Sequence, residues 1–450
     1  MSRSSNAIVL AATIVPLAGL VVLIATYAVN VPFWDDWRWA AMIVTADAGR
    51  LTFADLWHPN NEHRILIPSL IALGLARLGG YDTVRECFFS VACVAATLGF
   101  VLVLLRRTVP SALVAPLFAV SALLLFSLGQ VQSWLWGFQL AWFFIDLCLF
   151  AQIVALSGER LGWGQWTTAL VATLLASFSS AFGLGTLAVG FFLLFVRRPR
   201  LRGALVLWLA FSLAIVLVYL WGMHFDQPQY RPLHDATLWQ RLQFLLVFEG
   251  APIGGWIGNE WSLAFGVLAL GLGAALALRF VRLVLDEPRA AAAWAPWLGV
   301  LLFGFLGGVL TAAGRSGWGL DFARSARYIT LATLTWVALV PLATLALARV
   351  VPQTKRIWRA LALSGAVIVA ASFGLMNVTG FELFHAGNEV LLHDLFLVRD
   401  YRNVNNATLV AALFAEPRAL AVWRASRDPD PDRIRELIAQ LAAAHEGPFR

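Results

Sequence analysis

Long, unbroken runs of apolar residues are the feature that most restricts how this chain can fold. They include residues 8–29, 87–105, 204–222 and 328–348, which contain almost no charged side chains. A run of about 20 apolar residues is long enough for a helix to cross the hydrocarbon core of a bilayer. Since backbone polar groups in lipid need partners within a helix or a closed barrel, and these runs show no polar alternation, they predict membrane-spanning helices.

The composition indicates the same class. Hydrophobic residues make up 60% of the chain and charged residues 13%, with a mean hydropathy of +0.76, whereas soluble domains have roughly 45–50% apolar and about 25% charged residues. We therefore predict an all-α polytopic membrane protein with about eleven transmembrane helices, within roughly 10 to 13. The predicted spans are residues 8–29, 87–105, 112–129, 138–156, 167–180, 183–196, 204–222, 262–281, 296–313, 328–348 and 359–378.

The basic residues indicate how these helices are oriented. They cluster beside the spans in alternate connections, as the positive-inside rule requires of the cytoplasmic side. The clusters are Arg3; Arg106 and Arg107; Arg197, Arg198, Arg200 and Arg202; Arg279 and Arg282; and Arg349, Lys355, Arg356 and Arg359. The net charge of +7 is thus assigned to orientation, and no nucleic-acid partner is predicted.

On this orientation, the outer face carries residues 30–86, residues 223–261 and the connection 314–327. We predict a transmembrane domain over residues 1–378 and a short extramembrane helical tail over residues 379–450, which is also expected on the outer side, in the periplasm or at the cell exterior. Asp432 is the expected N-cap of a helix in that tail.

Two helices are expected to lie on the outer surface without crossing it. Segment 65–78 is apolar but too short for a comfortable crossing, so we expect an interfacial helix with Trp57 and Tyr81 near its ends. The stretch LWQRLQFLLVF within residues 223–261 has helical periodicity with one polar face, and it predicts a second surface-lying helix.

The first outer loop carries a paired acid, Asp35 and Asp36, between Trp34 and Trp37. An apolar environment at the membrane surface can raise the basicity of a carboxylate, and indole rings offer flat faces for a sugar. Adjacent residues on a helix point about 100° apart, so we expect one aspartate to face a substrate and the other to cap a helix or pair with a base. The alternative is a pair of solvated acids held by interfacial tryptophans.

The same loop ends in a dense polar cluster. Its members are His58, Asn60, Asn61, Glu62, His63 and Arg64. We expect a hydrogen-bonding cluster that orients a phosphate, because a guanidinium can grip an anion in a fork. The spacing matches no strong zinc motif. Should a divalent cation such as Mg²⁺, Mn²⁺ or Ca²⁺ take part, its candidate ligands are Asp36, Glu62 and His63.

Arginines also occur in the connection 314–327, where the positive-inside rule does not call for them. Arg324 and Arg327 are three residues apart, so we expect them on one helical face, where a pair could bind a lipid phosphate. The alternative is general anchoring to anionic lipid. Arg315 precedes them in the same connection.

Asp146 is predicted to lie inside a span. An intramembrane acid is a functional hypothesis by default, but with Gln139 and Gln152 nearby we favour a structural role in which the acid is hydrogen-bonded within the bundle. The three cysteines, Cys87, Cys93 and Cys148, show no spacing typical of a disulfide or a zinc site and are expected to be core residues.

The arrangement resembles the GT-C superfamily of integral-membrane glycosyltransferases, which take sugars from polyprenyl-phosphate carriers. Five features are similar to those of the family. They are the acidic pair after the first span, the expected surface helices at 38–48 and 65–78, Arg85 before the second span, Arg106-Arg107 after it, and Ser-Ala-Arg-Tyr at 325–328. The resemblance covers residues 1–110 and 315–335. The His-Pro-Pro or Lys-Pro-Pro element of some branches is absent, with PNNEHR in its place, which leaves the acceptor open among lipid, glycan and protein.

The resemblance implies transfer of a sugar from a polyprenyl-phosphate donor, with inversion at the sugar carbon. One of Asp35 and Asp36 would act as general base, and Arg324, Arg327 and Arg64 would neutralise the leaving phosphate. The implied donor-binding residues are Trp34, Trp37, His58, Asn61, Glu62, His63, Arg64, Arg324, Arg327 and Tyr328. The implied setting is envelope polysaccharide synthesis at the bacterial cytoplasmic (inner) membrane, with the site facing the periplasm or exterior. The rival hypotheses are a transporter or flippase for a lipid-linked glycan and a non-catalytic assembly partner.

Overall fold

The computed structural model describes residues 3–158, 161–196, 202–223, 236–350, 356–404, 409 and 431–449. Regular secondary structure in these residues is helical, as predicted, apart from an isolated bridge between Asn60 and His63. The helices are α1 (Arg3–Tyr27), α2 (Asp36–Asp47), α3 (Phe53–Trp57), α4 (Leu66–Gly79), α5 (Thr83–Thr108), α6 (Ser111–Leu125), η1 (Leu128–Gln130), α7 (Val131–Leu135), η2 (Gly137–Gln139), α8 (Leu140–Leu156), α9 (Trp163–Ser177), η3 (Ala181–Leu184), α10 (Gly185–Val196), α11 (Arg202–Leu220), α13 (Leu238–Gly254), α14 (Asn259–Asp286), α15 (Pro288–Arg315), η5 (Ser316–Trp318), α16 (Leu320–Ala323), α17 (Ala326–Val350), α18 (Arg356–Arg399), α21 (Pro431–Ala444) and η7 (Gly447–Phe449).

Eight helices among the described residues are long and apolar enough to cross a membrane. They begin with α1 and include the segments Thr83–Thr108, Ser111–Leu135, Gly137–Leu156, Gly203–Leu220, Asn259–Asp286, Pro288–Trp318 and Ala326–Ala348. The predicted spans 167–180 and 183–196 fall on α9 and α10, which are only 15 and 12 residues long. Span 359–378 falls within α18, where many of the side chains lie outside the described residues. The polytopic class is thus supported, whereas the predicted number of about eleven spans is not confirmed.

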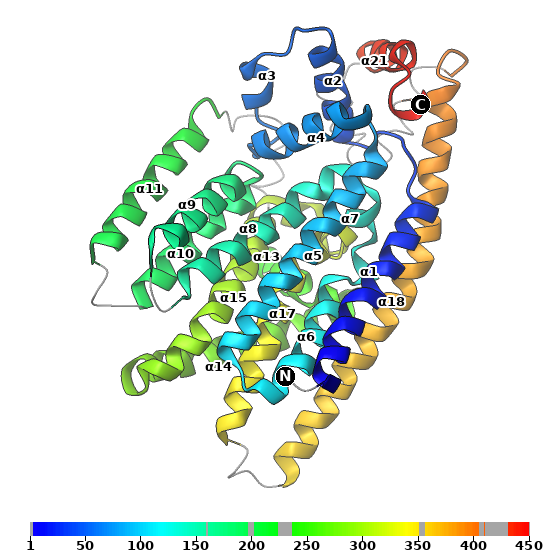
Figure 1. Cartoon of the computed structure of the whole chain (residues 1–450). Coiled ribbons are helices and arrows are strands. Elements are labelled where there is room, and N and C mark those ends of the chain that lie inside the picture. Colours follow the sequence, from blue (N-terminus) through cyan, green and yellow to red (C-terminus); the bar gives the residue numbers. More distant parts are fainter. Residues whose placement is uncertain are drawn as a thin grey trace.

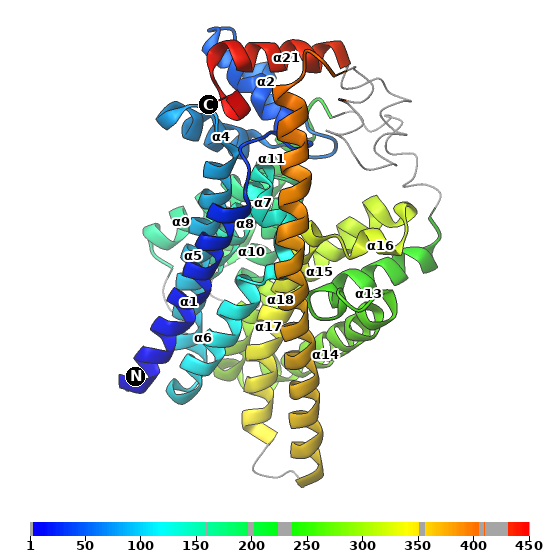
Figure 2. The ribbon, with the colours of Figure 1, turned by 90° about the vertical axis from the view of Figure 1, so that its right-hand side faces the viewer.

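The long helices run side by side, and the short helices α2, α3, α4 and α21 gather at one end of the molecule (Figure 1). Helices α2, α4 and α21 lie across that end, and Figure 2 shows the same arrangement after the turn. The opposite end of the molecule contains the amino end of α1 and the α5–α6 connection. The carboxyl end of α17 and the amino end of α18 also lie there. Arg3 of α1 and the pair Arg106-Arg107 at the end of α5, all predicted to be cytoplasmic, therefore share one end of the molecule, and the first outer loop is at the other.

The first outer loop folds into the two expected helices and a short third one. Helices α2 and α4 closely match the predicted segments 38–48 and 65–78. Between them, α3 begins at a capping box in which Thr52 accepts from the backbone of Asp55 and the Asp55 side chain accepts in return from Thr52. Tyr81 is not an interfacial anchor as predicted, because its ring is buried and its hydroxyl donates to the backbone oxygen of Asp36 at 3.3 Å.

Helix α13 contains the LWQRLQFLLVF stretch, and the prediction that this stretch lies on the surface is wrong for its second half. Residues 238–243 are exposed or half-buried, whereas those from Phe244 to Gly254 are buried, except Leu246. A Cβ at Gly250 would lie 1.8 Å from the Ser262 oxygen, and one at Gly266 would lie 1.8 Å from the Leu246 oxygen. These glycines let the backbones of α13 and α14 approach closely, as small residues do between membrane helices.

The carboxyl-terminal part of the chain is bound to the first outer loop. Asn30 donates to the oxygen of Gly447 at 2.9 Å, and the amide of Gly447 donates to Tyr81 at 3.2 Å. Helix α18 runs without interruption through the predicted domain boundary at residue 378. Helix α21 starts at Pro431, so Asp432 lies inside its first turn and is not the N-cap.

Candidate active site

A cavity of about 260 Å³ lies where the first outer loop meets the start of α8, the end of α15 and the start of α17. The predicted site residues that line it are Trp34, Asp35, Asn61, Glu62, His63, Arg327 and Tyr328. Residues from the first loop and from the connection 314–327 are more than 200 positions apart in sequence, and the fold brings them to one space.

Asp35 is the member of the acidic pair that faces this cavity. It directly precedes α2, and its Oδ1 accepts from Asn60 Nδ2 at 3.5 Å. It forms no ion pair with a described residue. Burial raises the pKa of Asp35, although Asn60 and the charge of Arg327 oppose the rise. A carboxylate with raised basicity and a free oxygen edge is suited to accept a proton.

Asp36 has a structural task. It is 1% exposed, and its two oxygens accept from the backbone amides of Phe33 at 3.1 Å and Phe138 at 2.9 Å. Burial raises the pKa of Asp36 well above its usual range, and the charge of Asp35 adds to the rise. Of the pair, Asp35 lines the cavity, and Asp36 instead holds η2 against the start of α2.

Arg327 is a cation with no anionic partner among the described residues. It lies in the first turn of α17, is 8% exposed and lines the cavity. Its guanidinium carbon lies 4.8 Å from the ring of Phe322, 5.2 Å from Trp34 and 5.3 Å from Tyr328. Aromatic faces stabilise a cation without neutralising it. The side chain is thus held in place and stays available for an anionic ligand.

Glu62 and Arg315 form an ion pair in the same wall. Arg315 Nη2 donates to Glu62 Oε1 at 2.5 Å, and both residues line the cavity. Burial alone raises the pKa of Glu62, but His63 beside it and the charge of Arg315 more than offset this, so the net pKa is lowered. Glu62 is therefore ionised at neutral pH and fixes Arg315 at the edge of the cavity.

His63 supports this ion pair. Its Nδ1 accepts from the backbone amide of Ala181 at 3.3 Å and lies 3.2 Å from the Ser180 hydroxyl. Since a backbone amide can only donate, the ring proton resides on Nε2, which lies 3.5 Å from Glu62 Oε1. Burial lowers the pKa of His63, although the charge of Glu62 opposes this, and the ring orients Glu62.

Two arginines predicted to bind the donor phosphate lie elsewhere. Arg64 is 1% exposed and donates to backbone oxygens of Trp57, Tyr219 and Trp221, so its fork is already occupied. Arg324 donates to Asn259 at 2.7 Å and to the oxygen of Gly255 at 2.7 Å, and it pairs with Asp321 at 2.8 Å. Arg324 and Arg327 do not share a helical face, because α17 begins only at Ala326.

Other predicted residues also lie outside the cavity wall. His58 is exposed and its Nδ1 lies 2.9 Å from the oxygen of Pro59, while Trp37 is buried in the core. The candidate metal ligands Asp36, Glu62 and His63 do not converge, since Asp36 is bound to backbone amides. In the part of the chain that the structure describes, no group of three histidine, cysteine, aspartate or glutamate residues could hold a metal ion.

The expected hydrogen bonding of Asp146 is not found. Asp146 is buried and its Oδ1 has no partner among the described residues. Gln152 donates instead to Thr173 and Thr186, both at 2.8 Å, and Gln139 lines the cavity. The cysteines are buried and unpaired in this structure, in agreement with the prediction.

Comparisons with family models, curated proteins and solved structures find no match to this chain. The cavity wall also contains residues that the predicted donor-binding set omitted, among them Arg315, Trp136 and Gln139. The sequence does point to Arg315, because it is an arginine in the connection 314–327, where the positive-inside rule does not call for one. Nothing in the sequence points to Trp136 or Gln139 as site residues, since they lie in an aromatic stretch that resembles an ordinary membrane helix.

Proposed function

We propose that this protein is a GT-C-type membrane glycosyltransferase. It moves a sugar from a polyprenyl-phosphate donor to a cell-envelope acceptor at the outer face of a bacterial cytoplasmic membrane. The observation that carries the proposal is that Asp35 and Arg327 line the same cavity. Neither forms an ion pair with a described residue, and the ring of Trp34, the residue before Asp35, packs against the Arg327 guanidinium. A ligand that combines a hydroxyl with a phosphate satisfies both groups.

The chemistry follows from these positions. Asp35 takes the proton from the acceptor hydroxyl as its oxygen bonds to the anomeric carbon of the sugar. The bond from that carbon to the phosphate oxygen breaks, and the lipid phosphate leaves with an added negative charge. Arg327 lies where this charge develops, and a preorganised cation of this kind favours the transition state over the ground state.

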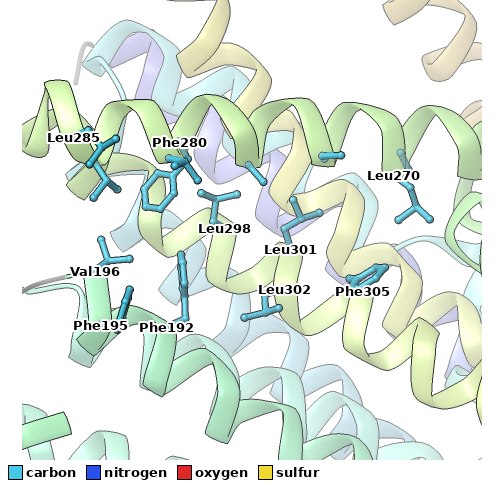
Figure 3. A pocket seen from close by; sticks show the side chains of 16 residues that line it. Phe192, Phe195, Val196, Leu270, Phe280, Leu285, Leu298, Leu301, Leu302 and Phe305 are labelled. Carbon is cyan, nitrogen blue, oxygen red and sulfur yellow. The ribbon is translucent and has the colours of Figure 1, made fainter.

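A second, apolar cavity supports a lipid-linked donor (Figure 3). It has a volume of about 830 Å³ and is lined only by hydrophobic residues of α10, α14 and α15. Helix α15 lines both cavities, with Leu301 and Phe305 in the apolar one and Gly314 in the polar one. From Phe305 to Gly314 the helix rises about 14 Å. A phosphate near Arg327 could thus have its hydrocarbon chain along the same helix.

Filling the apolar cavity tests this assignment. We expect Ala274→Trp, on the cavity side of α14, to raise KM for a long-chain donor about tenfold or more, because one large side chain displaces several isoprenoid carbons from apolar contact. A donor with two isoprene units should be unaffected. Ala275→Trp is the matched control, since Ala275 is also exposed on α14 but does not line the cavity. Equal effects of the two variants on the long-chain donor would contradict the assignment.

The raised pKa of Asp35 predicts the pH dependence of transfer. A general base works only when deprotonated, so activity should fall as pH drops through the Asp35 pKa, at a pH above the ordinary aspartate value of about 3.9. Asn60→Ala removes a hydrogen bond that lowers this pKa, so the acid limb should move to higher pH. A pH–rate profile measures it, with the exposed Asn403→Ala as control. An unchanged acid limb in Asn60→Ala would exclude Asp35 as the titrating base.

The direct experiment uses the purified full chain in lipid nanodiscs with radiolabelled polyprenyl-phosphate sugars and a panel of lipid and glycan acceptors. We expect release of sugar from one donor class, and its loss in Asp35→Asn. Binding without release from any donor, with any acceptor, would argue against the enzyme.

Transport of a lipid-linked glycan is the second candidate. It is favoured by two buried acids, Asp146 and Glu249, which have no ion-pair partner among the described residues. Intramembrane acids are common in transporters. Neither acid lines the polar cavity, however. If Asp146→Asn abolished movement of a labelled lipid-linked glycan across proteoliposomes while Asp35→Asn did not, the transporter would replace the enzyme.

A further inference from the structure

Several residues that line the cavity carry a buried hydrogen-bonding group with no partner among the described residues. These groups are the indole nitrogens of Trp34 and Trp136, Oε1 of Gln139 and Oε2 of Glu62. Buried polar groups in proteins are nearly always hydrogen-bonded, and leaving one unpaired is costly. Two donors and two acceptors around one cavity match a ligand with several hydroxyls, since each hydroxyl both donates and accepts.

The size and the walls of the cavity restrict this ligand further. Its volume of about 260 Å³ is that of about nine water molecules at ~30 Å³ each, which is room for one sugar ring and its phosphate but not for a second ring. Aromatic side chains, including Trp34, Trp136, Trp142 and Tyr328, form much of the wall. Such flat apolar faces suit the C–H faces of a sugar.

The charges indicate that the sugar itself is uncharged. Glu62 neutralises Arg315, which leaves Arg327 for one phosphate and Asp35 for one hydroxyl. A carboxylate on the sugar would have no further unpaired cation among the charged residues of the wall and would face Asp35. An ammonium group on the sugar would form an ion pair with Asp35, and Asp35 could then no longer act as the general base.

We propose, resting on the proposed function, that the cavity accepts a single uncharged sugar ring and that Trp136 and Gln139 select it by hydrogen bonds to its hydroxyls. Both side chains lie at the turn before α8, and Asp36 holds this turn through the amide of Phe138. Trp136 is also packed edge-on against Phe33 and Trp34, both at 5.5 Å between ring centroids. The two selecting groups are therefore rigidly placed relative to Asp35.

The test compares donors that differ only in the sugar. The panel carries neutral hexoses, their single-deoxy analogues, a uronic acid, an amino sugar and a disaccharide, all on one polyprenyl phosphate. Binding is measured by displacement of a labelled donor from the full chain in nanodiscs, and transfer is measured separately. The variants are Gln139→Leu and Trp136→Phe, with Trp163→Phe as a control because Trp163 is 90% exposed.

We expect the neutral monosaccharide donors to bind at least about tenfold more tightly than the charged or disaccharide donors. Gln139→Leu should weaken the preferred sugar about tenfold, the usual effect of one lost hydrogen bond, and leave one deoxy analogue unchanged. If Gln139→Leu lowered the affinity equally for the sugar and for all its deoxy analogues, the role of Gln139 would be merely structural and the proposal would be overturned. Tight binding of the disaccharide donor would also overturn it. Selective binding of the neutral sugar without transfer would support this inference and contradict the enzyme. No sugar dependence of binding would overturn the inference even if transfer occurred.

Discussion

Replacing Asp35 with asparagine is expected to lower the rate of sugar transfer by about 10²–10⁴-fold, the usual contribution of a general base. The amide keeps the size of the side chain and its contact with Asn60, but it cannot take a proton from the acceptor hydroxyl. Donor binding should change little, because Arg327 and the aromatic wall remain. Single-turnover transfer and donor displacement, measured on the same preparation, separate the two effects.

The neighbouring acids provide the controls. Asp36→Asn should lower stability, since an amide has one oxygen for the two backbone amides that Asp36 now binds, and the unpaired one costs about 1–3 kcal/mol. Asp47→Asn, on α2 but exposed and paired with Arg77, should leave transfer unchanged. Full activity in Asp35→Asn would remove Asp35 from the chemistry and with it the proposed mechanism.

Removing the guanidinium of Arg327 is the second change with a large expected effect. Arg327→Ala should lower kcat/KM for the donor by about 10²–10³-fold, as removal of one preorganised charge-stabilising group typically does. Arg327→Lys should recover only part of this loss. Lysine keeps the charge but neither the forked geometry nor the stacking that the guanidinium makes with Trp34, Phe322 and Tyr328.

Arg324 is a matched control, three residues earlier in the chain. Arg324→Ala breaks contacts with Asn259, Gly255 and Asp321, so it should lower the midpoint of thermal unfolding and leave the affinity for the lipid phosphate nearly unchanged. Donor affinity is measured by displacement at two salt concentrations. If the two alanine variants weakened binding equally, Arg327 would be one of several general membrane anchors.

The helices were largely predictable because each one depends on its own sequence. A segment such as 204–222 is apolar throughout, and in lipid a helix is the only way for it to satisfy its backbone. All predicted spans fall on helices, although the number that cross the membrane is not confirmed. Helix α13 was misjudged, because its apolar residues are the same whether they pack on lipid or on α14.

The candidate site was predictable only in part. The sequence alone determined that the acids of the first outer loop and the arginines of the connection 314–327 are unusual for a membrane protein. It could not determine which members share a cavity, since burial and partner choice arise between segments far apart in the chain. Only the tertiary structure decided that Asp35 faces the cavity and Asp36 does not. It likewise decided that Arg64 and Arg324 are bound to other groups while Arg327 has no ion-pair partner among the described residues, because a guanidinium binds whichever oxygens the fold brings within reach.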